Sequence, residues 1–179
     1  MINRSVHLFF GTAVYILGAN AALAQMPAEP VAAKVQRVVD GDTIHVHVQD
    51  GARITGLGRS NTVKVRILGI DAPESCQVWG KESTRALRQM LPLGTVVLLR
   101  PTGVDKYGRL LSDVYVGETK FNVAAAMVES GNAWNWEERF SKGRYAVEQK
   151  RAQASSSGLW QGGSAIRPSD FRKLHGSCK

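Results

Sequence analysis

Short segments with the polar–apolar alternation of a β-strand dominate the first half of the sequence. Residues 43–48 alternate strictly, and residues 34–39 and 63–68 alternate approximately. Such alternation is typical of strands with one face buried and the other in water. Residues 95–99 form a continuous β-branched and aliphatic run, and residues 110–116 are a further strand candidate. Five short strands separated by turns favour a small closed or nearly closed barrel.

Three helices are expected around these strands. Residues 79–91 place several apolar side chains on one helical face. Asn122 is a candidate N-cap for a helix that ends near Val128, and a last helix is expected over about residues 144–157, stopped by Gly158. No internal repeat is present. The sequence therefore predicts an α+β fold, a five-stranded barrel of the OB type with three α-helices.

The N-terminus has the pattern of a secretory signal peptide. A short basic start is followed by an uncharged stretch over residues 6–23, which ends in Ala22-Leu23-Ala24. We expect cleavage after Ala24 and a secreted or periplasmic product; a membrane anchor is the alternative. The remaining chain divides into one domain over residues 25–161 and a C-terminal tail over residues 162–179.

Net charge and cysteine content restrict the partners and the environment. The formal net charge of +8 favours an anionic partner, and both nucleic acid and a membrane surface satisfy that condition. The two cysteines, Cys76 and Cys178, form an even pair in a chain expected outside the cytoplasm. A disulfide between them would tie the tail back to the domain, and two unpaired thiols are the alternative.

Acidic residues and arginines gather in three clusters next to predicted strands. The clusters lie at residues 40–42, 66–74 and 105–109. Each alone is weak evidence, because an Asp-Gly-Asp or Lys-Tyr-Gly-Arg sequence is also an ordinary turn. Together they contain carboxylates for a hard cation, arginines for a phosphate and a further carboxylate for an attacking water. Hydrolysis of a phosphodiester requires that set of groups.

The same clusters carry a resemblance to a known family. The segments VVDGDTIHV, VRILGIDAPES and VDKYGRLLSDVYV resemble, in this order and spacing, three signature segments of the staphylococcal nuclease family. The later segments ESGNAW and ASSSGLW also resemble that family's C-terminal helices. The resemblance extends from about Val35 to Trp160, which is nearly the whole predicted domain.

The resemblance implies a calcium site. Asp42 and Asp71 would bind Ca²⁺ through their carboxylates, and the backbone carbonyl of Ala72 would be a further ligand. The best-known member of the family has Thr at the position of Ala72. A backbone carbonyl does not depend on the side chain, so the exchange should be mild.

The resemblance also implies catalytic and substrate-binding residues. Glu74 matches the acid that deprotonates or orients the attacking water. Arg66 and Arg109 match the pair that binds the scissile phosphate. Lys106 and Tyr107 match positions that contact a terminal phosphate of the bound nucleotide.

These roles lead to one expected function and two alternatives. We expect an exported, monomeric, calcium-dependent nuclease that acts on DNA and RNA, prefers single strands and leaves 3′-phosphate ends with little sequence specificity. One alternative is a non-catalytic nucleic-acid-binding module of the OB type. The other is an exported partner-binding or cell-envelope protein that reuses the fold, with its binding role in residues 162–179.

Overall fold

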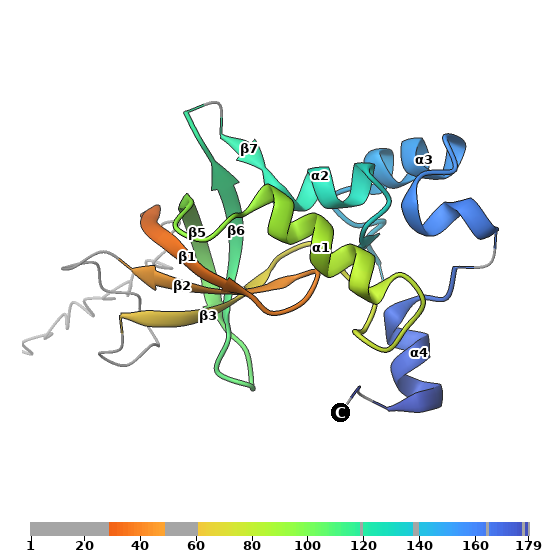
Figure 1. Cartoon of the computed structure of the whole chain (residues 1–179), viewed down its shortest axis with the longest axis horizontal. Coiled ribbons are helices and arrows are strands. Elements are labelled where there is room, and N and C mark those ends of the chain that lie inside the picture. Colours follow the sequence, from red (N-terminus) through yellow and green to blue (C-terminus); the bar gives the residue numbers. More distant parts are fainter. Residues whose placement is uncertain are drawn as a thin grey trace, which may run out of the picture.

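Five strands of the computed structural model close into a small barrel (Figure 1). The structure describes residues 29–48, 61–118, 120–137, 140–163, 165–176 and 178. β1 (Val31–Val38), β2 (Thr43–Val48) and β3 (Thr62–Ile67) form an antiparallel meander, and β5 (Val96–Val104) pairs antiparallel with β6 (Leu110–Val116). Antiparallel pairing of β1 with β5 and parallel pairing of β3 with β6 close the barrel. The predicted five-stranded barrel is confirmed. The predicted signal peptide lies outside the described residues.

Three shorter strands extend this framework. β7 (Phe121–Asn122) pairs with the end of β6, and β4 (Ile70–Asp71) pairs with β8 (Trp134–Asn135) in a separate two-stranded sheet. β4 follows β3 after a two-residue turn, so the chain leaves the barrel and is paired again immediately. This second pairing fixes the backbone of Asp71 just outside the barrel.

The described residues contain four α-helices. α1 (Gly80–Met90), α2 (Val123–Glu129) and α3 (Ala146–Ala154) correspond to the predicted helices, and Asn122 caps α2 as expected by accepting a hydrogen bond from the backbone of Ala125. A 3₁₀ turn, η1 (Gly158–Gly162), follows α3. None of these helices has the length and apolar character needed to cross a membrane.

The fourth helix, α4 (Pro168–His175), lies in the segment that was expected only as a tail. Pro168 stands in the first turn, where its missing N–H costs nothing, and it is the only residue of α4 that is fully buried. A helix of only eight residues is shorter than the segments that a periodic pattern assigns with certainty. Its position therefore depends on contacts with the rest of the protein, which the sequence pattern does not contain.

The strand β5 is longer than the expected residues 95–99, because it continues through Pro101 to Val104. Proline has no N–H to donate to a neighbouring strand. The register of β5 against β6 shifts between Pro101 and Gly103, so a bulge accommodates the residues that do not pair regularly.

The barrel interior and the helices share one hydrophobic core. Ile44, Val65, Leu99 and Leu110 are fully buried from four different strands. α1 contributes Leu87 from the apolar face that the sequence predicted. Figure 1 shows α1 and α2 side by side at one end of the barrel, where the chain also turns from β1 to β2. The ends of these strands therefore have a rigid support.

Candidate active site

The turn between β1 and β2 fixes the side chain of Asp42. A Cβ atom at Gly41 would overlap the hydroxyl of Ser83 on α1 and the methyl of Ala72, so only glycine allows this close approach. The carboxylate of Asp40 accepts a hydrogen bond from the backbone N–H of Asp42 at 3.0 Å. The hydroxyl of Thr43 donates to Asp42 Oδ1 at 2.9 Å. Asp40 thus supports the turn.

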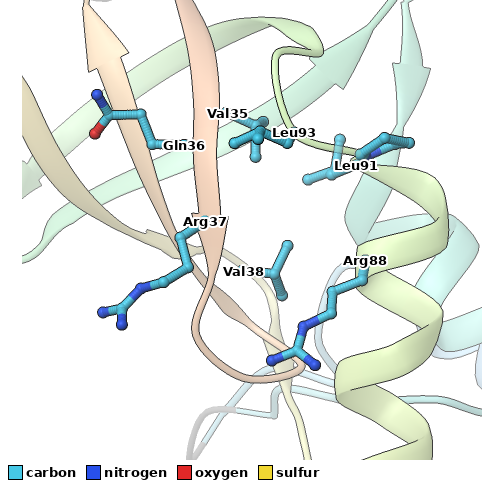
Figure 2. Close-up of a pocket in the computed structure, with 8 residues that line it drawn as sticks. Val35, Gln36, Arg37, Val38, Arg88, Leu91 and Leu93 are labelled. Atoms are coloured by element: carbon cyan, nitrogen blue, oxygen red, sulfur yellow. The ribbon is translucent and has the colours of Figure 1, made fainter.

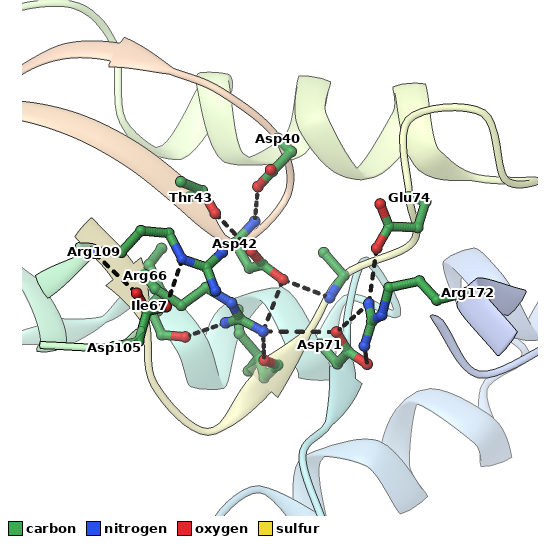
Figure 3. Close-up of polar contacts among 12 residues, drawn as sticks. Asp40, Asp42, Thr43, Arg66, Ile67, Asp71, Glu74, Asp105, Arg109 and Arg172 are labelled. Carbon is green, nitrogen blue, oxygen red and sulfur yellow. Dashed lines mark hydrogen bonds and ion pairs between the residues drawn. The ribbon is translucent and has the colours of Figure 1, made fainter. Parts of the chain in front are cut away.

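Asp42 and Asp71 converge, although they lie 29 positions apart in the sequence. Both are buried, with 7% and 5% of their surface exposed. One guanidinium nitrogen, Nη2 of Arg66, lies 3.1 Å from Asp42 Oδ2 and 3.6 Å from Asp71 Oδ1. Asp42 Oδ2 also accepts the backbone N–H of Ala72 at 3.0 Å, which joins the two segments (Figure 3). The three residues expected to hold a cation are therefore neighbours.

Burial raises the pKa of two carboxyl groups in this region, those of Asp71 and Asp40. Desolvation raises the pKa of Asp71, although hydrogen bonds from Arg172 and the charge of Arg66 oppose the shift. The pKa of Asp40 rises from 3.8 to about 6, first because of burial and then because of repulsion from Asp42. Both shifts indicate that the site concentrates negative charge away from water.

Arg66 lies on β3, and Arg109 immediately precedes β6, the strand that pairs with β3. β3 and β6 run parallel with Arg66 opposite Leu111, so Arg109 lies at the start of the neighbouring strand. The guanidinium of Arg66 donates to the backbone carbonyls of Ile67 and Ile70. Arg109 Nε donates to Asp105 Oδ2 at 2.7 Å. The barrel thus brings both expected phosphate-binding arginines to one region (Figure 3).

Asp105 organises the turn that precedes β6. Its Oδ1 accepts the backbone N–H groups of Tyr107 and Arg109, each at 2.9 Å. Burial acts to raise the pKa of Asp105, but these bonds and the Arg109 side chain outweigh burial and lower it. Asp105 therefore stays ionised and holds Arg109 in place.

Lys106 and Tyr107, the expected substrate-binding residues, lie in the same turn. Tyr107 is 71% exposed. Its ring centre lies 5.1 Å from Lys106 Nζ and 5.4 Å from the guanidinium carbon of Arg109. Both side chains thus border Arg109 on the surface, whereas Asp42 and Asp71 are buried.

Glu74 contacts a residue that the sequence reasoning missed. Arg172, on α4, donates from Nη1 to Glu74 Oε1 at 2.8 Å and to Asp71 Oδ1 at 3.2 Å, and from Nη2 to Asp71 Oδ2 at 3.2 Å. Burial acts to lower the pKa of Arg172, but its hydrogen bonds to Asp71 and Glu74 outweigh burial and raise it. The third arginine of the site therefore comes from the segment expected only as a tail.

The cysteine pair was the sequence signal that could have located Arg172. Cys76 lies two positions after Glu74, and the structure places its sulfur at disulfide-bonding distance from that of Cys178, with the Cα atoms 5.7 Å apart. A bond between Cys76 and Cys178 necessarily brings residues near 178 to the turn that carries Glu74. Which basic residue of the tail then reaches Glu74 is decided by the course of α4.

The donor groups fit a hard divalent cation held by few protein side chains. No group of three or more His, Cys, Asp or Glu side chains placed to bind a metal occurs among the described residues. Asp42 and Asp71 supply two carboxylates, and calcium accepts backbone carbonyls and water as its other ligands. Arg66 and Arg172 contact these carboxylates and offset part of their negative charge (Figure 3).

Two of the hollows on the described surface differ in their relation to the site. The larger, about 420 Å³, lies between β1 and the end of α1 and is lined by Val35, Val38, Arg88, Leu91 and their neighbours (Figure 2). None of the expected site residues lines it. The smaller, about 70 Å³, lies beside Asp71 and is lined in part by Trp136 and Arg167. Of the expected site residues, Asp71 alone lines the smaller hollow.

Comparison with known proteins identifies the family of this chain. The model of the family described as staphylococcal nuclease homologue matches residues 64–162, more than half of the chain. An uncharacterized endonuclease of Haemophilus influenzae is 36% identical over 129 residues, which cover 72% of this chain and 71% of that protein. Protein ParB of Escherichia coli is 35% identical over 176 residues (88% and 91% covered), and micrococcal nuclease of Shigella flexneri is 32% identical over 149 residues (78% and 79%). The chain belongs to the staphylococcal nuclease family.

Proposed function

We propose that this protein is an exported, calcium-dependent nuclease that hydrolyses phosphodiester bonds in DNA and RNA and leaves 3′-phosphate ends. The observation that carries the proposal is the convergence of two buried carboxylates, Asp42 and Asp71, on one nitrogen of Arg66. A binding module has no need for buried acids at a phosphate-binding arginine. The names of the relatives, an endonuclease and a micrococcal nuclease, support the same reaction class.

Arg66 and Arg109 bind the scissile phosphate in this proposal. Each guanidinium is now paired with an aspartate, Arg66 with Asp42 and Arg109 with Asp105. A guanidinium has five N–H donors in a planar fork, so each arginine can also donate to phosphate oxygens. Two such forks offset the negative charge that grows on those oxygens in the transition state.

Glu74 acts on the attacking water. Its carboxylate accepts a proton from the water while the water oxygen forms a bond to phosphorus. The bond from phosphorus to the 5′ oxygen breaks in line with this attack, and the 5′ oxygen leaves with the electron pair and takes a proton from solvent. The phosphate stays on the 3′ side of the cut.

Asp42, Asp71 and the carbonyl of Ala72 would hold the calcium ion. When bound, a divalent cation offsets the charge of the phosphate and polarises its bond to oxygen. The buried position of both carboxylates keeps water from competing with the phosphate.

The same contacts account for the proposed breadth of substrate. Arginine forks recognise phosphate, which is identical in every sequence, so discrimination between bases should be small. Lys106 and Tyr107, exposed beside Arg109, would contact a neighbouring phosphate. We propose single strands as the preferred form, because the acids are recessed and a flexible strand can bend toward them. The monomeric state, the Cys76–Cys178 disulfide and export after cleavage at Ala24 complete the proposal.

Product analysis tests this function. The purified protein is incubated with a DNA or an RNA oligonucleotide, in calcium or in a chelator. The masses of the fragments are then measured by mass spectrometry. We expect fragments with 3′-phosphate and 5′-hydroxyl ends only when calcium is present. Equal turnover with chelator would contradict the metal role, and binding without any fragment would favour the binding-module alternative. N-terminal sequencing of the exported chain, expected to begin at Gln25, tests the cleavage site.

A further inference from the structure

We infer that Arg172 is a positioning residue for Glu74, and that the C-terminal brace, defined here as Ile166, α4 and Cys178, holds the turn that carries Glu74. The inference rests on the proposed function, because it concerns the orientation of the group that acts on water. The family model ends at residue 162. The brace therefore lies outside the residues that the family model matches.

Arg172 is the group that fixes the Glu74 carboxylate. The bond from Arg172 Nη1, at 2.8 Å, is the only hydrogen bond that this carboxylate makes within the described residues. The same nitrogen also donates to Asp71 Oδ1, and Nη2 donates to Asp71 Oδ2. A planar guanidinium with fixed donor directions thus joins a partly exposed glutamate to a buried aspartate. It also reduces the repulsion between the two negative charges.

Arg172 approaches Asp71 from the side of Glu74, whereas Arg66 lies between Asp71 and Asp42 (Figure 3). The two arginines share Asp71 Oδ1, and Arg172 also donates to Asp71 Oδ2. Arg66 in addition contacts Asp42, whereas Arg172 in addition contacts Glu74. The bond from Arg172 to Glu74, at 2.8 Å, is shorter than its bonds to Asp71, at 3.2 Å, and favours a role for Arg172 in holding Glu74.

The backbone of the Glu74 turn depends on the brace as well. Gln77, which is 8% exposed, donates from Nε2 to the carbonyl of Ile166 at 2.7 Å and accepts the backbone N–H of Glu74 at its Oε1 at 3.2 Å. One side chain therefore connects the brace directly to Glu74. The sulfur atoms of Cys76 and Cys178 meet one position before Gln77.

The far end of this turn is held by α1. A Cβ atom at Gly80 would overlap the carbonyl of Glu74, so the start of α1 packs directly on the Glu74 backbone. The turn thus lies between α1 on one side and the brace on the other. The turn contacts the brace in three places: Glu74 binds Arg172, Gln77 binds Ile166, and Cys76 lies at bonding distance from Cys178.

Such support matters because a catalytic carboxylate must be placed to within a fraction of an ångström. A glutamate side chain without partners samples several rotamers, and a displacement of about 1 Å costs on the order of 10²-fold in rate. Loss of Arg172 should therefore lower kcat and leave substrate binding nearly unchanged, because the phosphate contacts come from Arg66 and Arg109.

A double-mutant cycle tests this role. Hydrolysis of single-stranded DNA with calcium is measured for the wild type, Arg172→Gln, Glu74→Gln and the double variant. We expect R172Q to lower kcat by about 10- to 100-fold with KM changed less than about threefold. The same substitution should have almost no further effect when Glu74 is already Gln, because Arg172 acts through Glu74. A merely structural loss would instead add to the effect of E74Q.

Two further variants serve as controls. Lys173→Gln removes the same charge from the next position of α4, where Lys173 contacts only Asp170 among the described residues, and should keep the wild-type rate. Arg172→Lys should lie between wild type and R172Q, because an ammonium keeps the charge but cannot reproduce the fork. If R172Q does not fold, R172K replaces it in the cycle.

Calcium affinity, measured by calorimetry without substrate, gives a readout that does not depend on turnover. We expect R172Q to bind calcium within about threefold of the wild-type Kd. A much tighter affinity together with faster hydrolysis would overturn the inference, since Arg172 would then be a competitor of the cation. Unchanged kcat in R172Q, or additive effects in the cycle, would also overturn it while the proposed function stands. A wild type that never hydrolyses DNA would remove the proposed function and the positioning role together.

Discussion

The two sides of the Asp71 carboxylate are built in different ways. On one side Arg66 lies on β3, whose neighbours β2 and β6 are part of the closed barrel. On the other side Arg172 lies on α4, which buries only Pro168 completely. Arg66 is therefore fixed by folding of the core, whereas Arg172 is fixed by a few polar contacts and a cysteine pair. One half of the site, called here the strand-borne half, comprises Asp40, Asp42, Arg66 and Asp71 on the barrel strands and on the segments next to them. The other half is Arg172, which is attached separately through the brace. The two halves should respond differently to substitution.

Glu74 is where the two halves meet, so its loss should have the largest effect. Glu74→Gln keeps the shape and an oxygen for Arg172 but cannot accept a proton. We expect kcat to fall by about 10²- to 10⁴-fold, with oligonucleotide affinity close to wild type. Single-turnover kinetics and a binding titration measure the two quantities. A rate near that of the wild type would mean that another group activates the water.

The strand-borne half should also determine part of the pH dependence of stability. The folded protein holds Asp40 with a pKa of about 6 instead of 3.8, so the folded state binds this proton more tightly than the unfolded state. The contribution is present below about pH 4 and is lost as pH rises through about 6. Its size is at most about 3 kcal/mol, since each pKa unit corresponds to about 1.4 kcal/mol.

Asp40→Asn isolates that contribution, because Asn removes the charge and can still accept the backbone N–H of Asp42. We expect the variant to gain stability relative to the wild type between about pH 4 and 7. Urea unfolding across this range, with a chelator present, measures the difference. A constant difference between the two proteins at every pH would show that Asp40 has an ordinary pKa.

Arg66→Lys tests whether the strand-borne half acts independently of Glu74. Lysine keeps the charge but loses the fork that contacts Asp42 and two backbone carbonyls. We expect kcat/KM to fall by roughly 10- to 100-fold, and we expect a similar further loss when Glu74 is already Gln. Steady-state kinetics of the single and double variants give the answer. If the effect of R66K disappeared in E74Q, both arginines would act through Glu74 and the two halves would not be distinct.

Reduction of the cysteine pair should have the smallest effect. Without the bond from Cys76 to Cys178, Arg172 and Gln77 still hold the brace, so we expect kcat to fall only about two- to fivefold. The assay compares oxidised and reduced wild type, with Cys178→Ser as a protein that reduction should not change. If reduction lowered kcat as much as R172Q does, the disulfide alone would hold the brace in place. Two reactive thiols in the unreduced, unfolded chain would contradict the pair itself.

The sequence predicted the strand-borne half well, because its information is local. Alternation over residues 43–48 and 63–68 places the strands, and the acids and Arg66 follow from their positions at the strand ends. The parallel pairing that brings Arg109 beside Arg66 is not local, and only the barrel as a whole predicts it. In the structure Asp42, Asp71, Ala72 and Arg66 lie together.

The brace could not be predicted in the same way. α4 has eight residues with mixed polarity, and its basic residues Arg172 and Lys173 are equivalent in a sequence pattern. Their difference is tertiary: Arg172 reaches Asp71 and Glu74, whereas Lys173 contacts Asp170 on its own helix. The possible pairing of Cys76 with Cys178 predicts where the tail lies. It does not predict which side chains of the tail face the site. Contacts formed by docking of a short helix leave almost no periodic signal.

Hydrolysis of single-stranded DNA by wild-type and Asp42→Ala protein, with calcium and with a chelator, tests the central claim most directly. Asp42 lies in the strand-borne half and is expected to hold the cation, so its loss should not disturb the brace. The account predicts cleavage by the wild type in calcium and cleavage reduced at least about 10²-fold in the chelator and in the variant. Equal cleavage by both proteins, or cleavage that ignores the chelator, would contradict the assignment of Asp42 and Asp71 as a calcium-dependent catalytic site.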